Sequence, residues 1–524
     1  MREFLKRWPW YAAVLAAYPL LFISVTNPGQ VAAVDVAPVV AAGILAAVGL
    51  VVLVRPFVGN WAAAGLGAGW IVLLVYLYGP VNEWWLDWVR SGLEQQAAER
   101  TWYRAYPQLV HSAVWVLIAL AGIARLRLVA ARIPPKVTVG LNVVAGVLLA
   151  FLGIQATTHV KQPGDSAVER PTAGAVARTP AAKTAGPDIY FIVLDGYARA
   201  DVLAKYYGFD NGPFLDGLRQ RGFQVSDASR SNFYWTFLSL GSSLNLDYIQ
   251  SLVEAGLDPA SRDRTELYRI LRDNRAARFL RERGYRYVHL QSTWGGTASN
   301  PFADEFLPCH AGLFGNEYLR AVADASWLRA LESKASLDIA SCHLQNFETL
   351  GGQARAPGPK FVFAHFVPPH HPYLFDRDGT VLRRATISDQ FEFQKRLWED
   401  RAAYAGQLAY VNRRIGEAVG RLIDDSAEKP VIILVSDHGP NLRDGMYASE
   451  QRHIRLSNLT AMLLPGAPAG FLPPDATPVN HMRRVFNLYF DARLPLLPDR
   501  YFISDYRTPF DLEEVGLDND ELDE

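Results

Sequence analysis

Two kinds of hydrophobic pattern divide the chain. Before residue 157, long uncharged apolar stretches follow one another, whereas short apolar runs alternate with amphipathic stretches from about residue 188 onward. A helix needs about 20 apolar residues to cross the hydrocarbon core of a bilayer. Five early stretches fit this requirement, at residues 8–26, 34–54, 61–78, 106–124 and 137–157. The pattern predicts a transmembrane domain of five helical spans over residues 1–157.

Lys and Arg residues are unevenly distributed among the short connections between these spans. They precede the first span, follow the second, and lie between the fourth and fifth: Arg2, Lys6 and Arg7, then Arg55, then Arg125, Arg127, Arg132 and Lys136. If the spans alternate in direction, all these groups lie on one side, which the positive-inside rule makes cytoplasmic. We therefore expect a multi-pass protein of the cell (inner) membrane. Its N-terminus is expected in the cytoplasm and its second half outside, in the extracytoplasmic or periplasmic space.

After the last span the pattern changes twice. Residues 158–187 are rich in Ala, Pro, Thr and Gly and are predicted to form a flexible linker. Strands are then predicted at 189–194, 223–225, 287–290, 361–365, 431–435 and 460–464, and helices between them include 212–221, 266–283 and 397–423. This alternation indicates an α/β domain with a doubly wound, mostly parallel sheet over residues 188–510. Residues 511–524 are expected to be a solvated acidic tail.

Composition narrows the classes of partner and cofactor. The net charge of -1 predicts no nucleic-acid binding, and nothing in the sequence indicates an obligatory protein partner. Only two cysteines occur, Cys309 and Cys342, which excludes a cysteine-rich zinc site or an iron–sulfur cluster held by this chain alone. A single disulfide is plausible if this half is extracytoplasmic, and two unrelated buried thiols remain the alternative.

Two predicted strands end in polar side chains that suit a metal ion. The run "VIILV" is followed by Ser, Asp437 and His438, and "IYFIVL" is followed by Asp195, with a glycine after each motif. Chemistry in open α/β sheets gathers at the carboxyl ends of strands. Carboxylates combined with an imidazole favour one zinc or manganese ion, with a second metal not excluded. The alternative is a polar turn in which Asp437 caps the next helix.

Hydroxyl and imidazole groups elsewhere add candidates for catalysis. In "SRSNFYWTFLSLGSS" a hydroxyl at a helix start would meet backbone N–H groups that favour an oxyanion. Spacing does not choose among the candidates Ser231, Thr236, Ser239, Ser242 and Ser243, and a serine-rich packing face explains several equally well. In "KFVFAHFVPPHHPY" a proline-stiffened loop could hold an imidazole over a substrate, from His365, His370 or His371; the alternative is a turn whose histidines cap helices.

Taken in order, "VLDGYAR", "SNFYWT", "HFVPPHHPY" and "SDHG" resemble the sulfatase-like branch of the alkaline phosphatase superfamily. The layout of spans, linker and outward domain is similar to lipoteichoic acid synthases and phosphoethanolamine transferases. The resemblance implies a metal held by Asp195, Asp437, His438 and the nucleophile Thr236, with His370 contacting the substrate. The further residues expected to bind substrate are Arg230, Asn232, His365 and His371.

The sequence departs from these relatives at two points. Sulfatases carry Cys or Ser followed by Pro-x-Arg, and nothing near Thr236 fits, which disfavours a sulfate-ester hydrolase. The transferases generally have Glu where this chain has Asp195, which leaves the substrate class open. Extra ligands for a second metal are not identified, and His453 and His481 are spare candidates only.

Three functions are compatible with these observations. The leading hypothesis is a membrane-bound, metal-dependent phospho-transferase or phosphodiesterase that acts on phospholipid headgroups or envelope glycans through Thr236, with an envelope acceptor or water completing the reaction. The second is a tethered hydrolase of small soluble phosphate or sulfate esters. The third is an inactive module that binds envelope polymers.

Overall fold

The computed structural model describes residues 8–27, 33–94, 107–160, 186–252, 258–310, 312, 317–328, 332–382, 398–442, 446 and 448–516. The chain forms two compact units. The first comprises Met1–Val168 and Tyr318–Leu331, and the second comprises Glu169–Glu317 and Glu332–Glu524. Most of the predicted linker and the end of the predicted acidic tail lie outside the described residues.

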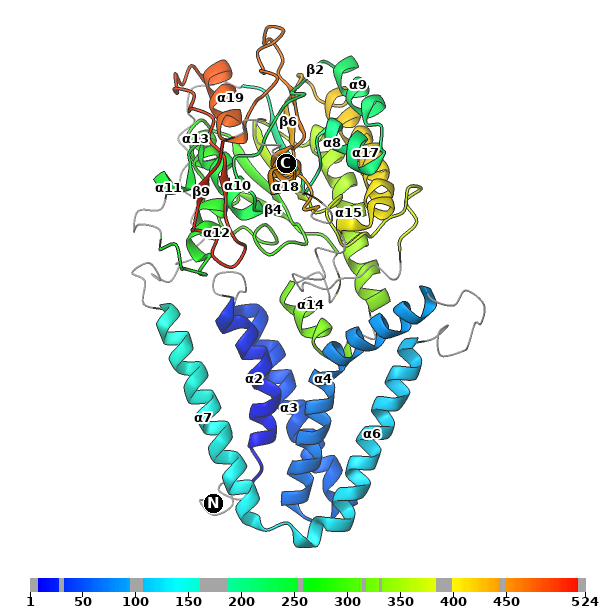
Figure 1. The fold of residues 1–524 in the computed structure, drawn as a ribbon. Coiled ribbons are helices and arrows are strands. Elements are labelled where there is room, and N and C mark those ends of the chain that lie inside the picture. Colours follow the sequence, from blue (N-terminus) through cyan, green and yellow to red (C-terminus); the bar gives the residue numbers. More distant parts are fainter. Residues whose placement is uncertain are drawn as a thin grey trace. The chain divides into compact units, whose positions relative to one another are not determined.

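Long apolar helices make up most of the first unit (Figure 1). They are α2 (Tyr11–Thr26), α3 (Ala33–Val58), α4 (Trp61–Glu94), α6 (Pro107–Val129) and α7 (Pro135–Val160), with the short 3-10 helix η1 (Ala130–Arg132) between the last two. Four helical segments are long and apolar enough to cross a membrane, at Val36–Val58, Trp61–Asn82, Leu109–Arg132 and Lys136–Thr157. These correspond to four of the five predicted spans. The remaining one is α2, which is apolar but has only 16 residues, so the count of five is not confirmed.

Polar contacts attach α2 to its neighbours within this unit. The backbone N–H of Tyr11 donates to Asn142 Oδ1 on α7 (3.0 Å), and the Tyr76 hydroxyl on α4 donates to the backbone oxygen of Ala16 (2.7 Å). Ala12, Ala16 and Leu20 are almost completely buried. The helix α2 is therefore an integral part of the bundle.

A short helix from the middle of the chain, α14 (Glu317–Asp324), also belongs to the first unit. Tyr318 and Val322 pack in one apolar cluster with Leu20 and Val36, and the Tyr318 hydroxyl donates to the backbone oxygen of Leu20 (3.1 Å). The sequence interval that we expected to form only the α/β domain thus contributes a helix to the apolar bundle.

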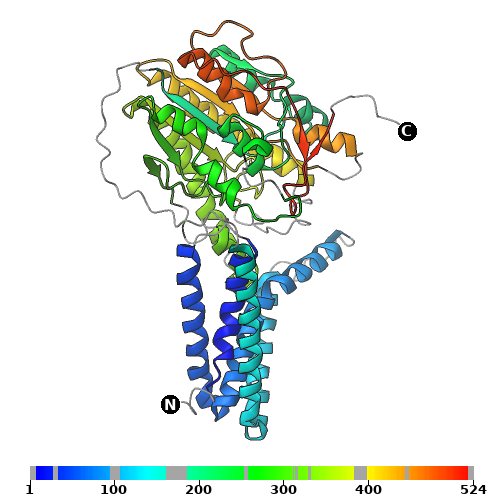
Figure 2. The same cartoon turned by 90° about the vertical axis from the view of Figure 1, so that its left-hand side faces the viewer.

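A seven-stranded sheet is the centre of the second unit (Figures 1 and 2). Its strands are β1 (Ile189–Leu194), β2 (Phe223–Val225), β3 (Arg286–Leu290), β4 (Glu305–Leu307), β5 (Lys360–Phe366), β6 (Val431–Val435) and β7 (Thr460–Leu463). Their order is β2-β7-β6-β1-β5-β3-β4, and β7 runs antiparallel to both of its neighbours. The predicted mostly parallel sheet is confirmed. The hairpin β8 (Phe502–Ile503) and β9 (Glu513–Glu514) forms a separate small sheet.

Helices cover both faces of the large sheet, as expected for a doubly wound domain. They are α8 (Ala200–Tyr207), α9 (Gly212–Gln220), α10 (Thr236–Asn245), α11 (Ile249–Leu252), α12 (Thr265–Arg272), α13 (Arg275–Arg281), α15 (Glu332–Gly352), η4 (Gln353–Arg355), α17 (Arg401–Asp424), α18 (Ala448–Leu456), η5 (Pro478–Asn480) and α19 (His481–Phe490). On one face, Phe191 and Phe363 belong to a core that includes residues of α10, α12, α13 and α19. On the other face, Phe347 of α15 stacks on Phe366, which has the opposite parity along β5.

The structure corrects two details of the predicted elements. Strand β4 was not predicted, because only three residues form it and none is fully buried. The single helix predicted at 266–283 is wrong, because α12 and α13 are separate helices. Asn274 lies between them, and its Oδ1 accepts a hydrogen bond from the Ala277 N–H (2.8 Å), which starts a new helix.

Candidate functional site

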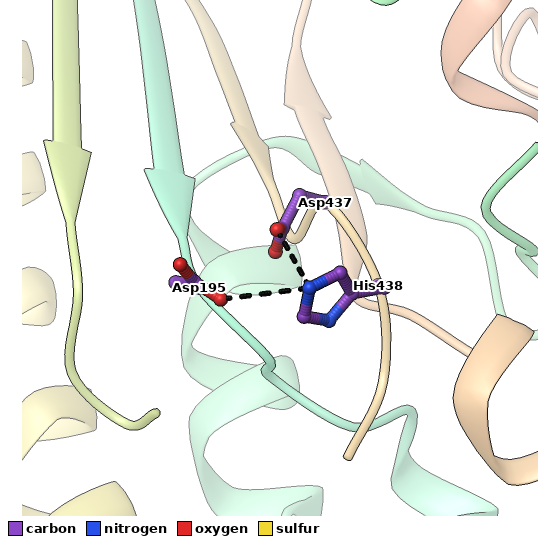
Figure 3. Close-up of side chains that lie close together, drawn as sticks. All are labelled: Asp195, Asp437 and His438. Atoms are coloured by element: carbon purple, nitrogen blue, oxygen red, sulfur yellow. Dashed lines mark ion pairs between the residues drawn. The ribbon is translucent and has the colours of Figure 1, made fainter. Parts of the chain in front are cut away.

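Two neighbouring parallel strands bring the predicted metal ligands together (Figure 3). Val193 of β1 pairs with Val435 of β6, so Asp195 and Asp437 each follow two residues beyond this pair, at the carboxyl edge of the sheet. His438 comes next in the chain. One ligand atom from each of these three residues lies within 4.8 Å of the others, and all three side chains are buried.

The unused lone pairs of this cluster point to a cation. His438 Nε2 lies 3.1 Å from Asp437 Oδ2 and 3.8 Å from Asp195 Oδ1. His438 Nδ1 donates to the backbone oxygen of Gly439 (3.0 Å), which leaves Nε2 as the acceptor nitrogen. Within the described part of the chain, Asp195 Oδ1 and Asp437 Oδ2 are buried and have no hydrogen-bond partner. Two oxygens and one imidazole nitrogen therefore fit a divalent ion as ligands.

Burial controls the protonation of the cluster. It raises the pKa of Asp437 to about 7, reinforced by the adjacent charge of Asp195. Burial likewise raises the pKa of Asp195 and lowers the pKa of His438 well below its usual value. In the absence of a positive ion, the site thus disfavours charged carboxylates and keeps its histidine neutral. A bound cation would reverse the preference of the carboxylates.

Backbone geometry explains the glycine that follows each ligand motif. Gly196 has φ +66°, and an added Cβ would lie 2.7 Å from the Trp398 ring. At Gly439 an added Cβ would lie only 2.1 Å from the backbone oxygen of Ile454. Both loops can therefore approach their neighbours closely only because no side chain is present. The local turns that aim Asp195 and His438 depend on this close approach.

Among the five hydroxyl candidates, the Thr236 hydroxyl is the one that contacts a side chain of the three-residue cluster in the described part of the chain. Thr236 is the first residue of α10, and its Oγ1 lies 3.1 Å from His438 Nε2. The four serines are buried, and each hydroxyl donates to at least one backbone oxygen. These bonds run from Ser231 and Ser239 to Asp437, from Ser242 to Asp247, and from Ser243 to Pro478. Their contacts are typical of packing and loop support.

The three loop histidines differ in their surroundings. His365 Nε2 lies 3.4 Å from Asp195 Oδ2, so its ring borders the cluster. The backbone N–H of His370 donates to the backbone oxygen of Asp195 (3.1 Å), while its Nδ1 donates to the backbone oxygen of His371 (2.6 Å). His371 is buried, and its ring centroid lies 5.2 Å from that of Trp398. Burial lowers the pKa of all three, to about 4 for His365, and keeps them neutral at pH 7.

The other predicted substrate contacts have partners elsewhere. The Asn232 amide donates to the backbone oxygen of Arg500 (3.0 Å) and accepts from the Val479 N–H (3.0 Å), which anchors the C-terminal segment. Arg230 lies beside Tyr501. Of the spare metal candidates, His453 Nε2 lies 3.5 Å from Asp201 Oδ2, and His481 is buried at the start of α19. Neither belongs to the three-residue cluster.

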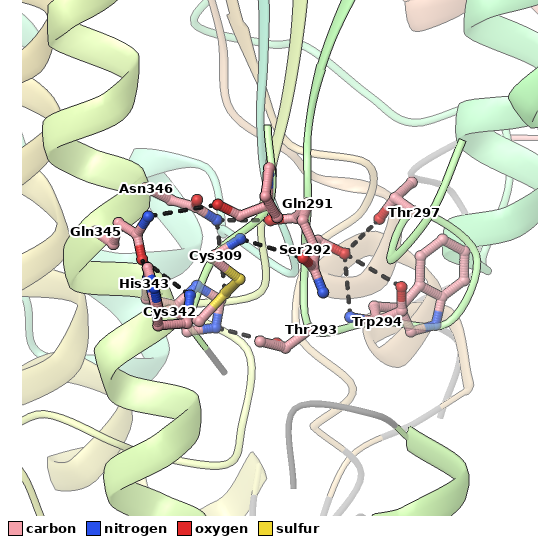
Figure 4. Close-up of a disulfide and its surroundings, with 12 residues drawn as sticks. Gln291, Ser292, Thr293, Trp294, Thr297, Cys309, Cys342, His343, Gln345 and Asn346 are labelled. Atoms are coloured by element: carbon pink, nitrogen blue, oxygen red, sulfur yellow. Dashed lines mark hydrogen bonds between the residues drawn. A yellow bond between two sulfur atoms is a disulfide. The ribbon is translucent and has the colours of Figure 1, made fainter. Parts of the chain in front are cut away.

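A disulfide lies next to the loop that supports His365 (Figure 4). Cys309 and Cys342 are bonded, which decides between the two alternatives left by the sequence. The Cys309 N–H donates to Gln291 Oε1 (3.1 Å) at the start of a loop that continues to Thr297. Thr297 Oγ1 in turn lies 2.8 Å from His365 Nδ1, so the bonded loop is linked to the ring beside Asp195.

Arg455 is the principal side chain at this site that sequence reasoning missed. It lies on α18, 17 residues after His438, and its Nη2 is 3.0 Å from His438 Nε2. Burial leaves only 4% of its surface exposed. One arginine in a polar, unexceptional stretch gives no signal in the sequence, and only the fold shows where its side chain lies.

Comparisons with known proteins find distant similarities only. A search of curated proteins found no match. Among solved structures, the periplasmic domain of EptC from Escherichia coli has a TM-score of 0.40 at 13% identity, over 62% of this chain and 91% of that one. The lipoteichoic acid synthase LtaP from Listeria monocytogenes has a TM-score of 0.36 at 13% identity, over 58% and 72%. The soluble domain of lipooligosaccharide phosphoethanolamine transferase A from Neisseria meningitidis has a TM-score of 0.37 at 15% identity, and the similarity covers 59% of this chain and 89% of that one.

One family model matches the chain directly. Its description is Sulfatase, and it covers residues 277–469. The matched interval includes β5, β6 and β7 with His365, Asp437 and His438, whereas Asp195 and Thr236 precede it. Over this interval the chain is similar to the Sulfatase family.

Proposed function

We propose that this protein is a membrane-bound, metal-dependent phospho-transferase or phosphodiesterase with Thr236 as its nucleophile. The observation that carries the proposal is the position of the Thr236 hydroxyl, 3.1 Å from His438 Nε2 in a cluster with two buried carboxylates. Asp195, Asp437, His438 and Thr236 would hold the ion, zinc or manganese. When bound, that ion supplies positive charge that favours a threonine alkoxide near neutral pH.

The reaction then has two steps that use the side chains of the site. In the first, Thr236 Oγ1 forms a bond to phosphorus as the bond to the leaving alcohol breaks, and His370 carries the threonine proton to that alcohol. In the second, an acceptor hydroxyl or water attacks the phospho-threonine, and His370 returns a proton to Thr236. A neutral His370 suits this role, because its Nδ1 donates to the backbone oxygen of His371 and leaves Nε2 free to accept.

Membrane attachment supports a lipid as one substrate. We propose five spans, with α2 as the first, because this helix is packed into the bundle by α4 and α7. The basic residues lie before the first span and in the connections after the second and fourth spans. With five spans, this distribution supports a cytoplasmic N-terminus and an α/β domain outside the cytoplasm. The disulfide between Cys309 and Cys342 agrees with an oxidising compartment. The donor in this proposal is a phospholipid headgroup of the outer leaflet.

Replacing Thr236 tests the proposal directly. The full chain is reconstituted into liposomes of phosphatidylethanolamine and phosphatidylglycerol with zinc or manganese, and lipid products are measured by mass spectrometry. We expect T236A to reduce turnover to the level of protein-free liposomes, T236S to retain part of it, and the control S243A to retain most of it. The control removes a buried hydroxyl from the same helix, at a position bonded to Pro478. Unchanged turnover in T236A would remove Thr236 from the mechanism.

The family match keeps a second candidate open, a tethered hydrolase of soluble esters. A simple comparison on the full chain separates the two. The lipid hypothesis predicts that phospholipid in mixed micelles is a better substrate than a water-soluble aryl phosphate or aryl sulfate at equal concentration. If the aryl phosphate or aryl sulfate is the better substrate, and T236A no longer hydrolyses it, the soluble-ester hydrolase is favoured.

A further inference from the structure

Residues 500–506, which we call the C-terminal strap, pair with the chain that leads into α10 (red in Figure 1). The Phe502 N–H donates to the backbone oxygen of Asn232 (2.9 Å), and the Asn232 amide donates to the backbone oxygen of Arg500 (3.0 Å). The rings of Phe233 and Phe502 stack with their centroids 5.3 Å apart. The strap therefore contacts the chain just before the proposed nucleophile through both backbone and side chains.

Tyr506 of the strap contacts the residues on both sides of Thr236. Its ring centroid lies 5.1 Å from that of Trp235 and 6.0 Å from that of Phe237. Trp235 has a second contact with the strap, because its Nε1 donates to the backbone oxygen of Ser504 (2.9 Å). Thr236 lies between these two aromatic residues as the first residue of α10. The strap thus holds both sequence neighbours of the nucleophile.

A buried arginine holds Tyr506 against α10. Arg264 precedes α12, and only 4% of its surface is exposed. Its guanidinium carbon lies 4.0 Å from the ring centroid of Tyr506 and 4.4 Å from that of Phe237, and its Nη2 donates to the backbone oxygen of Tyr506. A guanidinium over an aromatic face is attracted to it. Arg264 therefore fixes the end of the strap to the helix that begins with Thr236.

The metal-ligand edge of the sheet holds the same segment from another direction. Ser231 and Ser239 both donate through Oγ to the backbone oxygen of Asp437. The segment that contains Thr236 is thus fixed both to the strand end that carries the cluster and to the strap. Such support matters for catalysis, because a shift of about 1 Å in a reacting group can reduce the rate about a hundredfold.

We propose that the C-terminal strap, through Tyr506 and Trp235, positions Thr236 for its attack on phosphorus. This inference rests on the proposed function, because it takes Thr236 as the nucleophile. Neither the strap nor Thr236 lies within the interval that matches the Sulfatase family, residues 277–469. Tyr506 and Trp235 are positioning residues, so loss of their contacts should slow the chemical step and leave zinc binding and substrate binding unchanged.

Kinetic measurements on the zinc-loaded full chain test this role. The substrate is phosphatidylethanolamine in mixed micelles, and kcat and KM are obtained from the lipid products by mass spectrometry. Zinc affinity is measured by competition with a chelating dye, and folding by near-UV circular dichroism. Tyr506→Ala is expected to lower kcat about tenfold to a hundredfold. Its KM and zinc dissociation constant should stay within about twofold of the wild type. Because 38% of the Tyr506 surface is exposed, this substitution leaves most of the core intact.

Three further variants separate positioning from general stability. Tyr506→Phe keeps the ring and should retain most of the turnover. Trp235→Phe keeps an aromatic ring but loses the bond to Ser504, so a smaller, several-fold loss of kcat is expected. The matched control is Glu514→Gln. Glu514 lies on β9 beside the strap, where its carboxylate accepts from Arg500 Nε (2.8 Å), and this variant should match the wild type.

Each result has a defined meaning. An unchanged kcat in Tyr506→Ala would overturn the role of the strap while leaving Thr236 as the nucleophile; if that variant does not fold, Trp235→Phe decides in the same way. A loss of zinc affinity that matches the loss of kcat, or an equal loss of kcat in Glu514→Gln, would also overturn it, because the strap would then support only the fold. A wild type without lipid turnover, or unchanged turnover in Thr236→Ala, would instead refute the proposed function, and this inference with it.

Discussion

Replacing Asp437 by Asn is expected to stabilise the metal-free protein at pH 8 and to remove most of the stabilisation that zinc gives the wild type. The amide keeps the oxygen that accepts from the Gly196 N–H (3.0 Å), but it carries no charge. The effect should depend on pH, because burial raises the pKa of Asp437 from 3.8 to about 7. The two effects of the substitution, without and with metal, have opposite signs.

The size of the stability difference between D437N and the metal-free wild type follows from the raised pKa of Asp437. Between pH 4 and pH 7 the folded metal-free protein holds a proton on Asp437 that the unfolded chain has released, so its stability falls as the pH rises through this window. Each pKa unit corresponds to about 1.4 kcal/mol, which makes the total loss about 4 kcal/mol at pH 8. Asn does not titrate and avoids this loss. From pH 5 to pH 8 the stability advantage of D437N should therefore grow by about 3 kcal/mol.

Thermal unfolding of the full chain in detergent, followed by near-UV circular dichroism, measures both effects. In EDTA, D437N should unfold roughly 5 °C above the wild type at pH 8 and close to it at pH 5. With zinc at a hundredfold excess over its dissociation constant, the wild type should gain about 3 kcal/mol and D437N far less. The control D425N alters a carboxylate that pairs with Arg355 (2.9 Å) away from the site, and it should respond to zinc like the wild type. If D437N is less stable than the wild type in EDTA at pH 8, the electrostatic reasoning is wrong.

Two further predictions concern the scaffold of the site. Gly439→Ala should abolish zinc binding in the competition assay, because its Cβ would lie 2.1 Å from the backbone oxygen of Ile454 and displace the loop after His438; zinc affinity equal to that of the wild type would contradict this. The double variant C309S/C342S should lower the free energy of unfolding by about 4 kcal/mol, the loop-closure value for 33 residues, as measured by urea denaturation at constant pH. A denaturation midpoint unchanged from that of the wild type would show that the bond contributes no stability.

The strand ends at the site could be predicted from the sequence because they follow from local patterns. A fully apolar, β-branched run that ends in Asp identifies both the strand and the edge on which its carboxylate lies, as at Asp195 and Asp437. The sequence does not show that β1 and β6 are neighbours, although the doubly wound class makes it plausible. Their pairing, with Val193 opposite Val435, is what brings the two carboxylates together.

Other features depend on contacts between distant segments and could not be predicted. Nothing in the polar sequence of α18 shows that Arg455 reaches back to His438, and nothing in α14 shows that Tyr318 packs against Leu20. The five hydroxyl candidates are similar in sequence, and their partners separate them only in the structure. The helix break at Asn274 is local, but a capping Asn and a surface Asn have the same sequence signature.

The buried carboxylates also bear on whether the site is active or a remnant. Without a cation, Asp195 Oδ1 and Asp437 Oδ2 are buried with no hydrogen-bond partner among the described residues, an arrangement that costs several kcal/mol. A module that only binds polymers would gain stability by losing either carboxylate, since neither oxygen accepts a hydrogen bond within the described ranges. The destabilising pair is explained if a divalent ion offsets its charge.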